Sequence, residues 1–248
     1  MKINWFSPGP PIQCESAVHT AAVLPALARE ASITLWVHQP AWPPELAEHA
    51  EIRRYQPDAM PWIDLNAADV TIYHIANDAE LHGPIWQVAR QHPGIVVLYD
   101  LELQSLFDGL LRTQALSREE WLEMREYHHP GQKNIDELSK ECLLTGGAIE
   151  NAIGLVLHRT EAHAHLAKCV TMPVAHLPFP APETLADYIA GLRQLIENVL
   201  TARPREAAYR LSARAGRVMA PWFNPEAAGM LLPHVIEAIS DLCAEREL

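Results

Sequence analysis

The sequence predicts an α/β fold, in which a parallel sheet carries helices on both of its faces. Short apolar, β-branched runs alternate with amphipathic segments along residues 1–182, as in chains built from βαβ units. The run Ile95–Leu98 is apolar throughout, as expected of a strand that is covered on both sides. After residue 182 only helical periodicity remains. We therefore expect an α/β domain over residues 1–182 and a helical appendage over residues 183–248 that packs on it.

The individual elements can be placed in order from this alternation. The expected strands cover residues 2–6, 33–37, 52–55, 70–74, 95–98, 153–158 and 174–177. The expected helices or helical turns cover residues 16–30, 44–50, 61–68, 83–91, 102–111, 118–127, 135–145, 161–168, 183–200, 205–220 and 226–245. Gly146 and Gly147 are expected to end one helix, and Thr160 to cap the next.

Net charge, cysteine content and hydropathy indicate which partners and which cellular compartment to expect. The formal net charge of the 248 residues is −12, which argues against nucleic acid or an anionic membrane surface as a partner. The four cysteines are scattered without a C-x-x-C pair, as in proteins of a reducing cytosol rather than in disulfide or zinc frameworks. No apolar run approaches the roughly 20 residues of a membrane span. The sequence therefore predicts a cytoplasmic chain without an integral membrane segment.

Several motifs of known chemistry are missing from the sequence. There is no G-x-G-x-x-G, no G-x-x-x-x-G-K-[ST] and no G-x-S-x-G, so neither a dinucleotide site, a phosphate-binding loop nor a serine-hydrolase elbow is predicted. The 13 histidines include no H-E-x-x-H pair, and we expect no metal site. Most of these histidines are predicted to be surface residues or buried residues with satisfied hydrogen bonds.

Tyr99 and Asp100 are the first candidates for a ligand site. They follow the buried run Ile95–Leu98 directly, and ligands of open parallel sheets bind beyond the carboxyl ends of the strands. The alternative is an ordinary strand-to-helix turn in which Asp100 caps the following helix.

Four stretches carry a resemblance to a known family. They are Asn4–Pro11, Tyr73–Asp78, His82–Trp86 and His92–Asp100. In these stretches, and in consistent order over about residues 2–180, the chain resembles the N-terminal, acceptor-side domain of bacterial family-4 glycosyltransferases of the GT-B fold. The last helices are similar to those that fold back on the first domain of such enzymes.

The resemblance implies half of a two-domain enzyme. In the family, two Rossmann-like domains face each other across a cleft, the first holding the acceptor and the second the nucleotide-sugar donor. A second domain needs on the order of 100 to 150 residues, and the sequence passes from residue 182 directly to the terminal helices. We therefore expect the donor-binding domain to be absent and no cofactor to be bound by this chain, although a nucleotide-sugar is the donor expected for the family.

The resemblance also implies roles for individual residues. Asp100 would orient or deprotonate the acceptor hydroxyl, while Tyr99 and Asn77 would hold sugar and His158 would line the cleft. Two further positions are counted with the substrate-binding residues, Asp78 in the Ala-Asn-Asp that replaces the family's Gly-Asn-Asn, and Glu15, which stands where the family has a loop glycine. Tyr99 stands where the family has a histidine.

Three hypotheses follow from the resemblance. The chain is the acceptor-side half of a retaining transferase for cell-surface polysaccharide, completed by a donor-binding subunit. Alternatively it is a catalytically inactive glycan- or nucleotide-binding protein, or a scaffold for an active glycosyltransferase. The third hypothesis is a remnant without a partner. The apolar residues Met219, Trp222 and Phe223 are expected to dock on the α/β domain or to form a homodimer contact. The alternative is that they form an internal core of the tail.

Overall fold

The computed structural model describes residues 1–128 and 144–201 of the chain. The chain divides into two compact units, residues 1–196 and 197–248, and the fold below is that of the first. The helices predicted over residues 205–220 and 226–245, most of the helix predicted over residues 135–145, and the docking surface predicted around Trp222 all lie outside the described residues.

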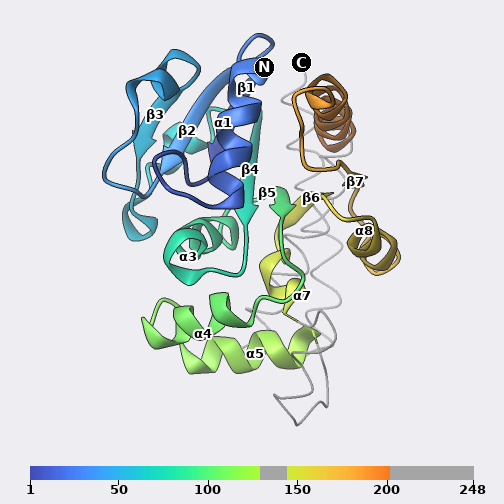
Figure 1. Cartoon of the computed structure of the whole chain (residues 1–248). Helices are drawn as coiled ribbons and strands as arrows, with labels where there is room; N and C mark the ends of the chain where they lie inside the picture. Colours follow the sequence, from blue (N-terminus) through green and yellow to red (C-terminus); the bar gives the residue numbers. More distant parts are fainter. Residues whose placement is uncertain (129–143, 202–248) are drawn as a thin grey trace, which may run out of the picture. The chain divides into compact units, whose positions relative to one another are not determined.

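The first unit is built on a seven-stranded parallel sheet (Figure 1). Its order is β3-β2-β1-β4-β5-β6-β7, and every neighbouring pair is parallel. The predicted Rossmann-like α/β arrangement is thus confirmed. The order changes direction between β1 and β4, so this pair is the topological switch point of the sheet. The strands are β1 (Lys2–Phe6), β2 (Ser32–Val37), β3 (Glu51–Arg54), β4 (Val70–Ile75), β5 (Gly94–Leu98), β6 (Ala152–Leu157) and β7 (Val174–His176).

Helices cover both faces of the sheet, as predicted. The longer ones are α1 (Glu15–Leu27), α3 (Ala79–Ala89), α4 (Gln104–Arg112), α5 (Arg118–His128) and α8 (Thr160–Leu166). Short turns of helix are η1 (Pro44–Glu48), η2 (Pro57–Ala59), α2 (Trp62–Leu65) and α7 (Thr145–Ala148). A further helix runs from residue 185 to 201.

The two faces of the sheet differ in chemistry because side chains alternate along each strand. Phe6 points to the face covered by α3, α4, α5, α7 and α8, where one continuous cluster of buried apolar side chains forms the main core. We call this the apolar face. Trp5 points to the other side, where its indole N–H donates to the Thr20 hydroxyl of α1 over 3.1 Å. We call this the α1 face.

Helix α3 begins at Ala79, four residues before its predicted start. The carboxylate of Asp78 accepts the backbone N–H of Leu81 over 3.0 Å and so caps the helix. Gly83 and Pro84, which suggested a helix start, lie inside α3 instead. A Cβ at Gly83 would lie 3.3 Å from Leu110 Cδ2, so the missing side chain lets α4 approach α3 closely.

Two further local predictions are corrected by the structure. Gly146 and Gly147 lie inside α7 rather than at the end of a helix, and a Cβ at Gly147 would lie 2.5 Å from Met124 Sδ. The glycines therefore serve close packing of α7 against α5. Thr160 is the first residue of α8 and not its cap, because the N-cap position is Arg159 and no side chain caps there.

The loop after β1 is fixed by one amide side chain. Gln39 Oε1 accepts the backbone N–H of Gly9 over 2.9 Å. Its Nε2 lies 3.0 Å from the carbonyl oxygens of Gly9 and Pro10 and 2.8 Å from that of Ala41. The loops that follow β1 and β2 are thereby held together at the carboxyl edge of the sheet.

Candidate functional site

A cavity of about 500 Å³ opens beyond the carboxyl ends of β5 and β6. Its volume lies in the range of small-molecule sites, and its position is where a parallel sheet presents a ligand. The loops after three strands, β4, β5 and β6, contribute to it. The polar residues that line the cavity are Asn77, Tyr99, Asp100, Glu102, His158, Arg159 and Glu161.

Four of the six predicted site residues meet in this cavity. Asn77, Tyr99, Asp100 and His158 come together because the carboxyl ends of neighbouring parallel strands share one edge. The other two do not line it. Glu15 is an exposed residue in the first turn of α1, and the Asp78 carboxylate is engaged in capping α3.

Asp100 and Asn77 form a hydrogen-bonded chain at the cavity wall. Asp100 Oδ2 accepts the backbone N–H of Asn77 over 2.9 Å, and Asn77 Oδ1 accepts the backbone N–H of Leu106 over 3.0 Å. Asp100 therefore does not cap α4, whose N-cap residue is Leu103. Asp100 Oδ1 and Asn77 Nδ2 have no partner within the described chain. These two atoms are therefore available to a ligand.

The Tyr99 hydroxyl points away from the cavity and into the protein. It lies 2.6 Å from His19 Nδ1 and 2.8 Å from His74 Nδ1. Burial raises the pKa of this phenol well above its usual value, so it stays protonated. Tyr99 therefore borders the cavity with its ring, and its hydroxyl is not available to a ligand.

His158 is held in one tautomer by the chain itself. Its Nδ1–H donates to the Leu177 carbonyl over 2.8 Å, which leaves Nε2 as the atom with a lone pair. Burial lowers the pKa of His158, and the bond to Leu177 opposes only part of this effect. A neutral imidazole thus faces the cavity with carbon atoms, while its Nε2 is buried.

Two buried histidines on the α1 face, His19 and His74, were missed by the sequence interpretation, and they meet the half-buried His158. His19, His74 and His158 lie close together, with ring centroids 5.2 Å apart for His19 and His74 and for His19 and His158. The Nε2 atoms of all three are buried without a hydrogen-bond partner in the part of the chain that the structure describes. The prediction of surface or satisfied histidines is therefore wrong for these residues. We call them, with Tyr99 and Tyr188, the imidazole cluster.

A weak signal for this cluster was present in the sequence. His74 lies within β4, all of whose residues are buried. His19 lies three residues after Ser16 on a helix, and both are on the buried side of α1. Periodicity could therefore place both histidines inside, although it could not show that they meet.

The switch point between β1 and β4 is filled by the protein's own side chains. His82 Nδ1–H donates to the His74 carbonyl over 2.9 Å, and its Nε2 lies 3.4 Å from the Ser16 hydroxyl. Both side chains are buried. The position where many doubly wound sheets hold a ligand is thus occupied by a contact between α1 and α3.

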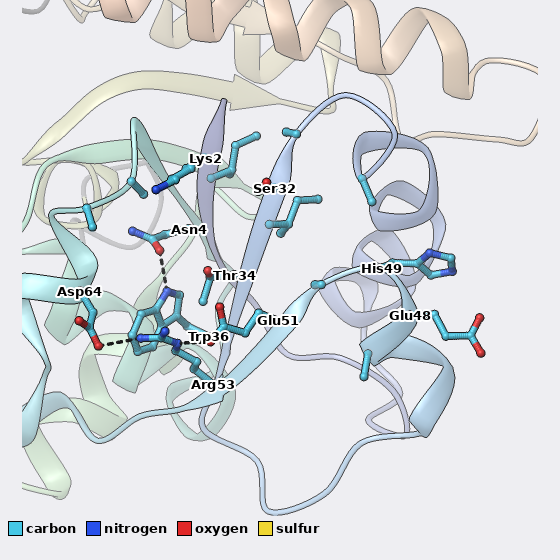
Figure 2. Close-up of a pocket in the computed structure, with 18 residues that line it drawn as sticks. Lys2, Asn4, Ser32, Thr34, Trp36, Glu48, His49, Glu51, Arg53 and Asp64 are labelled. Carbon is cyan, nitrogen blue, oxygen red and sulfur yellow. Dashed lines mark hydrogen bonds and ion pairs between the residues drawn. The ribbon is translucent and has the colours of Figure 1, made fainter.

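A larger cavity of about 630 Å³ lies at the β1–β3 side of the sheet (Figure 2). Five of its polar side chains bind one another. Arg53 donates to Glu51 over 2.8 Å and to Asp64 over 2.7 Å, and the Trp36 indole N–H donates to Asn4 Oδ1 over 2.9 Å. Because these groups already have partners and the cavity borders the beginnings of β1 and β2, we regard it as structural.

Other classes of site find no support in residues 1–128 and 144–201. These ranges contain no group of three or more histidine, cysteine, aspartate or glutamate side chains placed to hold a metal ion. No helix in them is both long and apolar enough to cross a bilayer. Comparison with protein-family models finds no match for the chain, and no curated protein matches it either.

Proposed function

We propose that this chain is a glycosyltransferase-like protein that binds a sugar of an acceptor glycan in the cavity beyond β5 and β6. The supporting observation is the pairing of an unused donor with an unused acceptor at one wall, Asn77 Nδ2 and Asp100 Oδ1. A sugar hydroxyl both donates and accepts, so vicinal hydroxyls match this pair. Glu102, Arg159 and Glu161 add further polar groups around the rim.

In a transfer reaction, Asp100 is the residue placed to act on the acceptor. Its free oxygen would accept the proton of the attacking hydroxyl, while the bond from Asn77 N–H holds the carboxylate in one orientation. The departing donor phosphates need basic side chains and helix N-termini. In this proposal a donor-binding partner supplies them, and the reaction serves cell-surface polysaccharide synthesis.

A catalytically inactive glycan- or nucleotide-binding protein, or a scaffold for an active transferase, is the second candidate. Two observations favour it. The Tyr99 hydroxyl is engaged with His19 and His74, so it cannot contact a transferred sugar. The side chains of Ser16 and His82 fill the switch point, where a donor would approach the first domain. A protein that binds a glycan without transferring a sugar needs neither a free Tyr99 hydroxyl nor an unfilled switch point.

Saturation-transfer NMR and calorimetry with a panel of neutral oligosaccharides test the binding proposal. Asp100→Asn replaces the ionised acceptor with an amide of the same shape, and we expect at least about tenfold weaker binding, because a hydrogen bond to a charged group contributes roughly 1.5–3 kcal/mol. Asp108→Asn is the matched control, since Asp108 is an exposed aspartate of α4 that does not line the cavity. Absence of saturable sugar binding, or equal affinities in all three proteins, would contradict the proposal.

Titration with UDP, GDP and ADP then tests whether this chain holds a donor site. Micromolar binding of a nucleotide by this chain would show a donor site and would call for transfer assays. Sugar binding without nucleotide binding is expected if transfer depends on a partner or does not occur.

A further inference from the structure

The imidazole cluster contains more nitrogen atoms than hydrogen-bond partners. The Tyr99 hydroxyl can donate to only one of its two neighbours, His19 Nδ1 and His74 Nδ1. The two imidazoles must therefore be opposite tautomers, one donating to the hydroxyl oxygen and the other accepting its proton. Tyr188 adds a fourth unsatisfied atom, because its hydroxyl is buried and has no partner among the described residues.

Every proton added to the cluster leaves a buried charge without an acceptor. A proton on His158 would go to Nε2, which is buried, since Nδ1 already donates to Leu177. The imidazole that donates to Tyr99 would take a further proton on its buried Nε2, where there is no acceptor. The other imidazole would take it on Nδ1, and the Tyr99 hydroxyl oxygen would then have to accept two hydrogen bonds. A buried charge without a partner is costly, and the short distances between the rings add mutual repulsion.

The segment that follows β7 packs over the imidazole cluster. Leu177 accepts the bond from His158, and the ring of Phe179 lies 5.6 Å from the rings of His19 and His158. The Tyr188 ring lies 5.0 Å from that of His19 and 6.2 Å from that of His158. This cover follows β7, which pairs with β6 alone, so lifting it leaves the pairing of β1 to β6 intact.

We propose that residues 177–196 form an acid-released latch over the imidazole cluster. With the latch closed the imidazoles are neutral, and with it open they are hydrated and take up protons as ordinary histidines do. This inference stands apart from sugar binding and needs no ligand. The buried side chains Ile189, Leu192 and Ile196 hold the latch closed at neutral pH.

The direction of the pH effect follows from proton linkage. Burial lowers the pKa values of His19 and His74 well below the usual value and lowers that of His158. The open form therefore binds more protons than the closed form once the pH falls below about 6.5, and closure weakens progressively below that pH. At pH 5.5 an imidazole that takes up no proton in the closed form favours the open form by about 11-fold. His19 and His74, whose pKa values lie well below the usual value, come nearest to this limit, and His158 contributes less.

Other titratable groups face the cluster from the elements packed around it. The phenol of Tyr99 senses Glu15 and Cys14 at the start of α1, together with Tyr188. His74 faces His82 of α3, which in turn senses Asp78 and Asp100, while His158 faces His176 of β7. Because His19, His74 and His158 contact one another and their pKa values are lowered by burial, the proposal assigns the acid response to these three imidazoles.

Hydrogen exchange followed by mass spectrometry tests the latch in the full chain. Exchange is measured at pH 7.0 and 5.5 and corrected for the intrinsic pH dependence of amide exchange. We expect peptides from residues 177–196 to lose at least about tenfold in protection at pH 5.5, while peptides from β1, β4 and β5 keep theirs. Unchanged protection of residues 177–196 would overturn the proposal, and so would an equal loss across the whole sheet.

Substitutions identify the titrating groups. His158→Asn keeps a side-chain N–H for the Leu177 carbonyl but cannot be protonated, so the acid response should shrink, by at most about tenfold. His38→Gln is the matched control, because His38 lies outside the cluster and contacts Tyr55, and its response should equal that of the wild type. An acid response in His158→Asn as large as that of the wild type would overturn the proposal. If the variant does not fold, the comparison of wild-type peptides at the two pH values still tests the latch.

Discussion

The two faces of the sheet are built on opposite principles. The apolar face is filled mainly by carbon-rich side chains, and one of its buried indoles, that of Trp86, donates to the Gly147 carbonyl over 3.0 Å. The α1 face also encloses two buried imidazoles, the half-buried imidazole of His158 and two buried phenols, several of whose polar atoms have no partner in the described chain. The first face gains most of its stability from apolar burial, whereas the second also holds imidazoles whose hydrogen bonds and protons affect its stability. We therefore expect pH to act on one face only.

Phe107→Ala should produce the largest loss, and that loss should not depend on pH. Phe107 is fully buried between Trp86 and Trp121, with ring centroids 5.5 Å and 5.3 Å away. Truncation leaves a cavity and should lower the free energy of unfolding by about 3–5 kcal/mol. Urea denaturation at pH 7.5 and 6.0 measures it. A loss that differs between the two pH values by more than about 1 kcal/mol would mean that the two faces are coupled.

Tyr99→Phe should have an intermediate effect on the α1 face. Removing the hydroxyl leaves two buried imidazole nitrogens without a partner, which should cost about 1–3 kcal/mol in the free energy of unfolding at pH 7.5. Tyr73→Phe is the matched control on the apolar face. Its hydroxyl lies 3.1 Å from His92 Nδ1, and His92 also bonds Asn66 near the surface. We expect a smaller loss there, and equal losses would remove the distinction between the faces.

Tyr188→Phe should have the smallest effect, and its sign is informative. The deleted hydroxyl is buried and finds no partner in the described residues, so its removal relieves an unpaired polar group. The free energy of unfolding should stay constant or rise by up to about 1 kcal/mol. Thermal denaturation at pH 7.5 measures this, and a clear drop in Tm would mean that the hydroxyl contributes a stabilising interaction.

Much of the fold could be predicted from sequence because strands and turns are local signals. The buried runs that became β5 and β6 are short, continuous and rich in β-branched residues, which favours strands over helices. Several of the errors fell on glycines that serve packing between helices. Gly83 and Gly147 are small because α4 and α5 approach closely, and a single sequence does not record which helix will be the neighbour.

The location of the site was predictable, whereas its hydrogen bonding was not. Asn77, Asp100 and His158 share a cavity because of a rule about strand ends. The orientation of the Tyr99 hydroxyl depends on His19, which lies 80 residues earlier in the chain. Such a contact is decided by how α1 crosses the sheet, and local periodicity carries no information about it.

The Gln39 amide that joins the loops after β1 and β2 has a consequence for association at that edge. A proline-rich loop held by one side chain through Gly9, Pro10 and Ala41 has already lost most of its conformational entropy on folding. A molecule that docks against it meets a rigid rim and loses little affinity to loop ordering. Binding of a molecule at this edge should therefore occur in a single step, with an observed rate that rises linearly with its concentration and without a slow rearrangement.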